Sequence, residues 1–203
     1  DVCWADLNND GVINNLDRVK VGNLFPTVTG GFSTTLGYKD FSLYARFDYA
    51  LGHTLYNDLA ARSLGQYQGS FNIIDMVKDS WSETNQDTDI PKFYYADQLS
   101  KKNITRSNNG LTAVDNNSSR FYEKGDYLAL REITLTWNLP KKWINKALMS
   151  NASVYVTGQN LFYITGYTGV SPEPAVDTTY GQGLDNGRYP TPKTVLLGLS
   201  VTF

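Results

Sequence analysis

Residues 41–51 read Phe41-Ser42-Leu43-Tyr44-Ala45-Arg46-Phe47-Asp48-Tyr49-Ala50-Leu51, and this stretch decides the fold. Every odd-numbered residue in it is apolar or aromatic, whereas Arg46 and Asp48 stand at even-numbered positions. Side chains alternate between the two faces of a β-strand. The pattern therefore predicts a strand with one wholly apolar face and one charged face.

The same alternation recurs along the chain. Phe32, Leu36 and Tyr38 share one face of the preceding segment, and Lys39-Asp40 then predicts a tight hairpin turn. Residues 127–139, 152–159 and 194–203 alternate in the same way. The predicted strands are about 10 to 13 residues long, whereas strands of soluble domains cluster near 5 or 6 and a tilted membrane strand needs about 9–11.

The connections between these segments are short on one side and long on the other. Lys39-Asp40 and residues 140–150 are short, whereas residues 53–126 and 166–192 are long. Bacterial transmembrane barrels have short periplasmic turns and long extracellular loops, with aromatic residues at each rim. The sequence thus predicts an all-β fold, the C-terminal strands of a large transmembrane β-barrel, with a soluble β-sandwich as the alternative.

About five long antiparallel strands cannot close a barrel, because an open sheet edge leaves unpaired backbone groups in lipid. We therefore expect an incomplete barrel, completed by an N-terminal part of the same protein, with a second chain as the less favoured alternative. The expected organisation is an extracellular loop over 1–26, a hairpin over 27–51, a long extracellular loop over 52–126 and the last three strands over 127–203. The C-terminus would then be periplasmic.

The composition excludes several classes of function. The net charge of −2 does not favour a nucleic-acid partner, whose phosphates require a basic face. Cys3 is the single cysteine and His53 the single histidine, so neither a disulfide nor a zinc site is expected, and His53 is interpreted as a loop residue. No catalytic constellation is evident, and we expect no enzyme activity.

Residues 6–17 have the spacing of a calcium-binding loop. Oxygen-bearing side chains stand at the first, third, fifth and twelfth positions, and Gly11 at the sixth permits the sharp turn. The predicted calcium ligands are Asp6, Asn8, Asp10, the carbonyl of Val12, and Asp17. The alternative is an Asn/Asp-rich turn that caps its own backbone without an ion.

Two groups of residues are candidates for ligand binding. Arg46 must face a water-filled lumen, because an arginine facing lipid costs about 2–4 kcal/mol at the midplane. The lumen-facing candidates are Tyr44, Arg46, Tyr155 and Gln159. The loop candidates are the aromatic residues Trp81, Tyr94 and Tyr95, which could stack on sugar rings or hold peptides, or could only pack the loop.

The chain also resembles a known family through motifs spread over nearly its whole length. The motifs are Asp6-Leu7-Asn8-Asn9-Asp10-Gly11, Gly30-Gly31-Phe32, Gly125-Asp126-Tyr127, Leu139-Pro140, Val154-Tyr155-Val156-Thr157-Gly158-Gln159-Asn160-Leu161-Phe162, Pro172-Glu173 and Tyr189-Pro190. Together they resemble the SusC/RagA family of TonB-linked outer-membrane proteins. Asn9 departs from the family pattern, where Gly is usual.

The resemblance implies a large barrel with an N-terminal plug, both beyond this chain, and energy supplied by the TonB complex. It further implies a SusD-like surface lipoprotein as a lid, outer-membrane lipid around the barrel, and import of glycans or oligopeptides in Bacteroidota. The leading hypothesis is therefore active nutrient import. A passive or adhesive outer-membrane barrel and a secreted calcium-loop β-sandwich are the alternatives.

Overall fold

The computed structural model describes residues 5–12, 15–61, 75–90, 92, 119–173, 183–187 and 189–203. Its long strands are β1 (Val28–Tyr38), β2 (Phe41–Leu51), β5 (Tyr127–Asn138), β6 (Asn151–Thr165) and β8 (Thr194–Thr202). The short strands are β3 (Thr54–Asn57), β4 (Tyr122–Lys124) and β7 (Leu184–Asp185). The helices are single turns: α1 (Asp58–Ala61), α2 (Lys141–Ile144), and the 3₁₀ turns η1 (Asn15–Asp17), η3 (Asp75–Asp79), η4 (Ser119–Phe121) and η5 (Asn145–Ala147).

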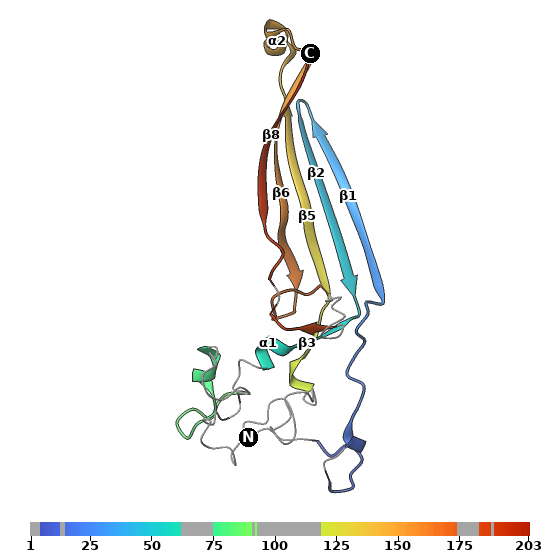
Figure 1. Cartoon of the computed structure of the whole chain (residues 1–203), viewed down its shortest axis with the longest axis vertical. Coiled ribbons are helices and arrows are strands. Elements are labelled where there is room, and N and C mark those ends of the chain that lie inside the picture. The colour runs from blue at the N-terminus through green and yellow to red at the C-terminus, as the bar shows by residue number, and fades with distance from the viewer. Residues whose placement is uncertain are drawn as a thin grey trace.

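The long strands form one antiparallel five-stranded sheet in the order β1-β2-β5-β6-β8 (Figure 1). The sheet is open, with β1 and β8 as its outer strands in the described part of the chain. The prediction of about five long antiparallel strands of an incomplete barrel is confirmed. The sandwich alternative is wrong, because no second sheet is layered on this one among the residues that the structure describes.

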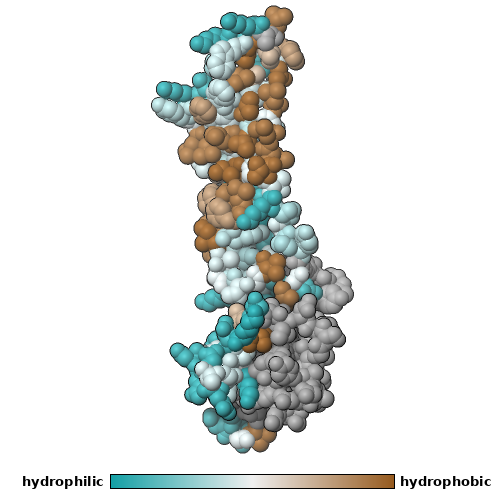
Figure 2. All heavy atoms as spheres, turned by 90° about the vertical axis from the view of Figure 1, so that its left-hand side faces the viewer, coloured by the Kyte–Doolittle hydropathy of each residue, from teal (hydrophilic) through white to brown (hydrophobic). Residues whose placement is uncertain are grey.

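The two faces of the sheet differ sharply, as the alternation predicts. One face, called here the apolar face, exposes large side chains to the surroundings, and Leu197 on it is 81% exposed. Figure 2 shows the resulting hydrophobic band above the loop end of the sheet. Its exposed members include Phe32, Leu36, Leu135, Val156, Ile164, Val195, Leu197 and Leu199. The opposite, polar face carries the charged residues of the strands.

Aromatic residues line the short-turn end of the apolar face. The register aligns Tyr38, Phe41 and Trp137 in one row across β1, β2 and β5, as predicted for a rim. The Phe41 and Trp137 rings stack with centroids 6.0 Å apart, and Trp143 of α2 meets Trp137 edge-on at 6.0 Å. The C-terminus lies at this end (Figure 1).

The opposite end of the sheet leads into a small folded unit. A three-stranded sheet in the order β4-β3-β7 lies there, and Tyr56, Val77, Ile90 and Phe121 form its core with Ala61. The turn η3 packs Val77 into this core. None of the helices in the described ranges is long and apolar enough to cross a membrane.

Candidate functional site

The predicted lumen residues of the strands share the polar face and fall on neighbouring cross-strand rows. Arg46 lies opposite Glu132, which in turn lies opposite Gln159. Tyr44 lies opposite Thr134 on the next row, and Tyr155 lies opposite Thr136 on the row after that. The structure therefore brings the four strand candidates onto one continuous polar surface.

Tyr155 occupies this surface because its neighbour has no side chain. A Cβ atom placed on Gly198, which lies opposite Tyr155 on β8, would stand 2.1 Å from the tyrosine ring. The ring thus occupies the space where a side chain at position 198 would stand. Gly198 is required here for close approach rather than for backbone freedom.

A β-bulge interrupts the regular pairing of the strands at Arg131 of β5. Between β2 and β5, Arg46 pairs with Glu132 and Phe47 pairs with Leu130, so Arg131 is an extra residue without a partner in the register. On β6 the extra residues are Asn160, whose φ is +51°, and Leu161. A bulge re-aims side chains. As a result, Arg131 and Glu132 both reach the polar face.

Arg131 is the centre of a charged cluster on this face. Its Nε and Nη2 donate to both carboxylate oxygens of Asp48 on β2, with Nη2 2.9 Å from Oδ2. Nη2 also donates to Glu173, and Nη1 donates to the Tyr163 hydroxyl at 3.1 Å and to Asn160 at 3.5 Å. The Tyr163 hydroxyl in turn donates to Glu173 at 2.9 Å. The Arg131 side chain is only 17% exposed.

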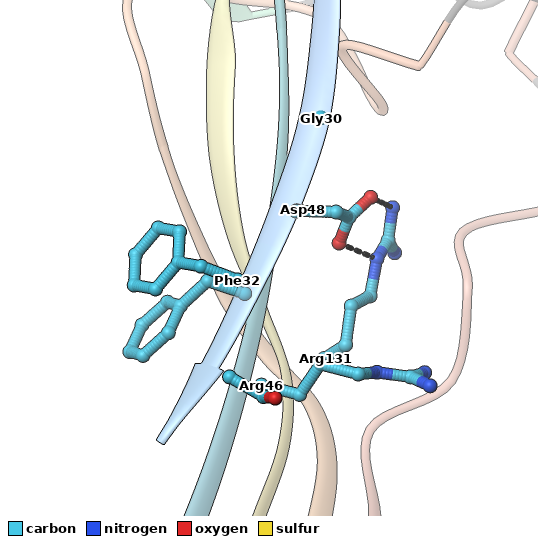
Figure 3. Close-up of a pocket in the computed structure, with 8 residues that line it drawn as sticks. Gly30, Phe32, Arg46, Asp48 and Arg131 are labelled. Carbon is cyan, nitrogen blue, oxygen red and sulfur yellow. Dashed lines mark hydrogen bonds and ion pairs between the residues drawn. The ribbon is translucent and has the colours of Figure 1, made fainter.

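A hollow of about 550 Å³ lies beside the ion pair, bordered by Gly30, Gly31, Arg46, Asp48 and Arg131. In Figure 3 the Arg46 and Arg131 side chains extend to the same side of the sheet as Asp48, whereas Phe32 points to the other side. There Phe32 stacks on Phe47 with centroids 5.0 Å apart. The hollow therefore opens on the polar face, with charged and glycine-lined walls.

A second polar network joins the loops at the end of the sheet. Tyr167 is buried and donates its hydroxyl to Asp185 of β7 at 2.8 Å. Burial raises the pKa of Tyr167 well above its ordinary value, and the bond to Asp185 raises it further, so the hydroxyl stays a donor. Glu123 of β4 accepts from the Thr168 backbone N–H and hydroxyl, both at 2.8 Å. Segments distant in the sequence are thereby fixed together.

His53 lies in the short loop between β2 and β3, as interpreted from the sequence, but this loop position is buried. It is 1% exposed, and its Nε2 lies 2.9 Å from the carbonyl oxygen of Pro172. Its ring fills the space above Gly125, where an added Cβ would stand 2.3 Å from Nε2. The burial of His53 was not predicted, because a lone histidine gives no local pattern that indicates it.

Of the three loop candidates, the structure describes Trp81, which lies away from the polar face. Trp81 lies in the small folded unit, where its backbone N–H donates to Ile90 at 2.9 Å and Lys92 lies 5.8 Å from the centre of its ring. Tyr94 and Tyr95 lie outside the described residues. A ligand role for these three aromatics stays a prediction.

The calcium-like loop is organised by its own side-chain oxygens. Asp6 accepts from the backbone N–H groups of Asp10 at 3.2 Å and Gly11 at 2.8 Å, and Asp10 accepts from Val12 at 2.8 Å. Asp17 accepts from the Leu7 N–H at 2.9 Å, which closes the loop. Within the described residues, no three His, Cys, Asp or Glu side chains converge at metal-binding distance. The calcium hypothesis for Asp6, Asn8, Asp10, Val12 and Asp17 stays a prediction.

Sequence reasoning missed Arg131 and Glu173 as site residues, although one signal was present. The large aliphatic residues of β5 are even-numbered at Leu128 and Leu130 but odd-numbered at Ile133 and Leu135, so the single alternation predicted over 127–139 is wrong before Arg131. This change of phase indicates an inserted residue between them, which is the bulge. No local signal pairs Arg131 with Glu173, since the two are 42 positions apart.

Comparisons with known proteins agree with the fold. No family model matches the chain. The chain is 33% identical over 207 residues to TonB-dependent receptor P26 of Formosa agariphila, covering 98% of this chain and 19% of that protein. It is 25% identical to TonB-dependent receptor SusC of Bacteroides thetaiotaomicron over 98% of this chain and 17% of that protein.

A solved structure of the RagAB peptide transporter is also similar to this chain. It superposes on 91% of this chain and 18% of its own with a TM-score of 0.68 and 25% sequence identity. The RagAB peptide importer in its "open-open" state gives a TM-score of 0.61 at 26% identity over 88% of this chain and 17% of its own. The chain thus spans about a fifth of the length of the proteins that it matches.

Proposed function

This chain belongs to the SusC/RagA family of TonB-dependent outer-membrane proteins, and from this premise we propose that it forms the C-terminal strands of an active nutrient importer. The cargo would be an oligomer, a glycan or an oligopeptide. A SusD-like surface lipoprotein would act as the lid, and the TonB complex would supply energy through the N-terminal part of the full-length protein.

The contrast between the two faces of the sheet carries the proposal. The apolar face exposes leucine, valine and phenylalanine side chains over the length of the strands, whereas Arg46, Asp48 and Arg131 are confined to the polar face. Placing an arginine against lipid costs about 2–4 kcal/mol at the midplane of the membrane. We therefore assign the apolar face to lipid and the polar face to the aqueous passage.

The proposed orientation follows from the connections. The Lys39-Asp40 turn and the connection through α2 and η5 lie at the same end of the sheet as the C-terminus (Figure 1). Short turns are periplasmic in bacterial barrels, and long loops are extracellular. The small unit built around β3, β4 and β7 would then face the cell exterior, where a lid protein and cargo arrive.

The cargo would meet hydrogen-bonding groups on the wall of the passage. Tyr44, Arg46, Tyr155 and Gln159 offer donors and acceptors on adjacent rows of the polar face. Peptides and glycans both present carbonyl, amide or hydroxyl groups that such side chains bind. The RagAB structures are described as those of a peptide importer, which favours peptide over glycan as the first cargo to test.

Uptake by the full-length protein in its own outer membrane tests the proposal. We expect saturable uptake that is lost when TonB is deleted, and co-purification of a surface lipoprotein. Replacing Arg46→Gln should lower uptake several-fold, whereas Lys39→Gln in the short turn should leave it unchanged. Uptake that persists without TonB would establish the passive barrel instead, and surface binding without uptake would establish the adhesive one.

A further inference from the structure

Residues 166–173, called here the return segment, fold back onto the polar face of the sheet after β6 ends at Thr165. The segment begins with a local turn, in which the Tyr167 N–H donates to the Thr165 hydroxyl at 3.1 Å. Its middle is tied to the loop strands through the bonds of Tyr167 to Asp185 and of Thr168 to Glu123. Its end reaches the strands themselves.

Two contacts hold the end of the return segment against the wall. Glu173 forms an ion pair with Arg131 and accepts a hydrogen bond from Tyr163, and both of these partners lie on the polar face. The carbonyl of the adjacent Pro172 meets the buried ring of His53. We call this pair of contacts the clasp. It places the return segment on the passage side of the sheet rather than on the lipid side.

The hydrogen bonds of Arg131 show what this residue does. Nε, Nη1 and Nη2 each already donate to protein groups, namely Asp48, Glu173, Tyr163 and Asn160. A guanidinium with its donors used in this way has little capacity left for a passing solute. Arg131 therefore joins two carboxylates, one on a strand and one on the return segment, and does not bind cargo.

We propose that Arg131 is a positioning residue that holds the return segment inward through Glu173, so that the segment is a fixed part of the passage wall and limits the size of solute that enters. The proposal rests on the proposed function, because a size limit has meaning only in a transport passage. The planar fork of arginine is needed for it, since one guanidinium must serve Asp48 and Glu173 together.

The first test measures the clasp itself in the full-length protein. A nitroxide label on Val170→Cys, in a protein whose native cysteines including Cys3 are replaced by Ser, reports the motion of the return segment, because Val170 is 38% exposed. Glu173→Gln and Arg131→Lys should each make the label several-fold more mobile, and the double variant should add little to either. Unchanged label motion in Glu173→Gln would overturn the clasp.

Glu132→Gln is the matched control for this test. Glu132 is the carboxylate next to Arg131, it lies in the row of Arg46, and Thr134 donates to it at 3.3 Å. It has the same charge and the same face as Glu173 but makes no bond to the return segment in the described structure. We expect the nitroxide label at position 170 to be as mobile in Glu132→Gln as in the protein without that substitution.

The second test measures the size limit. Uptake of fluorescein-labelled peptides and glucan oligomers, each in a series of increasing length, gives the ratio of long to short substrate. Glu173→Gln should raise this ratio several-fold, and Glu132→Gln should not. If Glu173→Gln makes the label more mobile but leaves the ratio of long to short substrate taken up unchanged, the size-limiting role is overturned. Absence of TonB-dependent uptake in the parent, with a loosened label in Glu173→Gln, would overturn the proposed function while leaving the clasp in place.

Discussion

Leu197→Arg is the substitution that most directly tests which face of the sheet meets lipid. Leu197 lies on β8 and is 81% exposed in the isolated chain. The register aligns it with Val156, and across the sheet with Leu135, Leu43 and Leu36, so it stands within a continuous apolar row. On β8, Leu197 is the fourth of nine residues, so on its own strand it stands away from both ends, where the membrane is driest.

The expected loss follows from that position. An arginine facing lipid costs about 2–4 kcal/mol at the midplane and less near the interfaces. Since about 1.4 kcal/mol is a tenfold change in an equilibrium constant, the folding equilibrium constant should fall by a factor of roughly 30 to roughly 700. The free energy of unfolding of the full-length barrel in lipid vesicles, from urea titration, measures this change.

Leu196→Arg is the matched control. Leu196 is the preceding residue on the same strand, has the same side chain and lies opposite Thr157 on the polar face. An arginine there would extend into water, so the free energy of unfolding should change by less than about 1 kcal/mol. Equal losses from the two variants, or a larger loss from Leu196→Arg, would refute the assignment of the faces.

Two further predictions concern the loop at the start of the chain and the last strand. Replacing Asp6 and Asp10 together with Ala should abolish calcium binding by the full-length protein, measured by calorimetric titration, and an unaltered titration would favour the turn that caps its own backbone. Gly198→Val should displace the Tyr155 ring, because an added Cβ would lie 2.1 Å from it, and lower the free energy of unfolding by about 1–3 kcal/mol; no loss in the urea titration would contradict the close packing.

The strands were predictable from the sequence because alternation is a local property. The chemistry of residues 41–51 fixes which side chains share a face, whatever their partners are. The predicted faces of β2 and β8 agree with the register, in which Leu43 meets Leu36 and Leu199 meets Val154. A tight turn then limits the pairing of β1 with β2 to one register.

The small folded unit could not be predicted in the same way. Strand β3 pairs with β4 and, in parallel, with β7, so Tyr56 meets Tyr122 and Leu184 from distant parts of the chain. Each of these strands is two to four residues long, which is too short for alternation to be recognised. Their pairing is set by packing around Tyr56 and Phe121 and not by any local sequence signal.

The bulge at Arg131 explains both why the faces of β5 were predictable only after it and why Arg131 was missed. On β5, Leu128 and Leu130 lie on the apolar face before the bulge at Arg131. Ile133, Leu135 and Trp137 lie on the same face after it. Without one inserted residue, one of these groups would turn to the passage, because a shift of a single position exchanges the faces. Arg131 is that inserted residue.

Strand β6, which pairs with β5, keeps its apolar residues on one face through a different insertion. On β6 the bulge inserts two residues, Asn160 and Leu161. An insertion of two residues does not exchange the faces, so Val156 and Phe162, both even-numbered, lie on the apolar face. Asn160 can adopt the left-handed backbone that this insertion needs, and Leu161 covers Gly158, which would otherwise leave a gap in the apolar face. Both insertions preserve the surface toward lipid, and the extra residue on β5 is free to carry a charge. The irregularity that keeps the apolar face continuous is therefore the same one that places a guanidinium where it can hold the return segment.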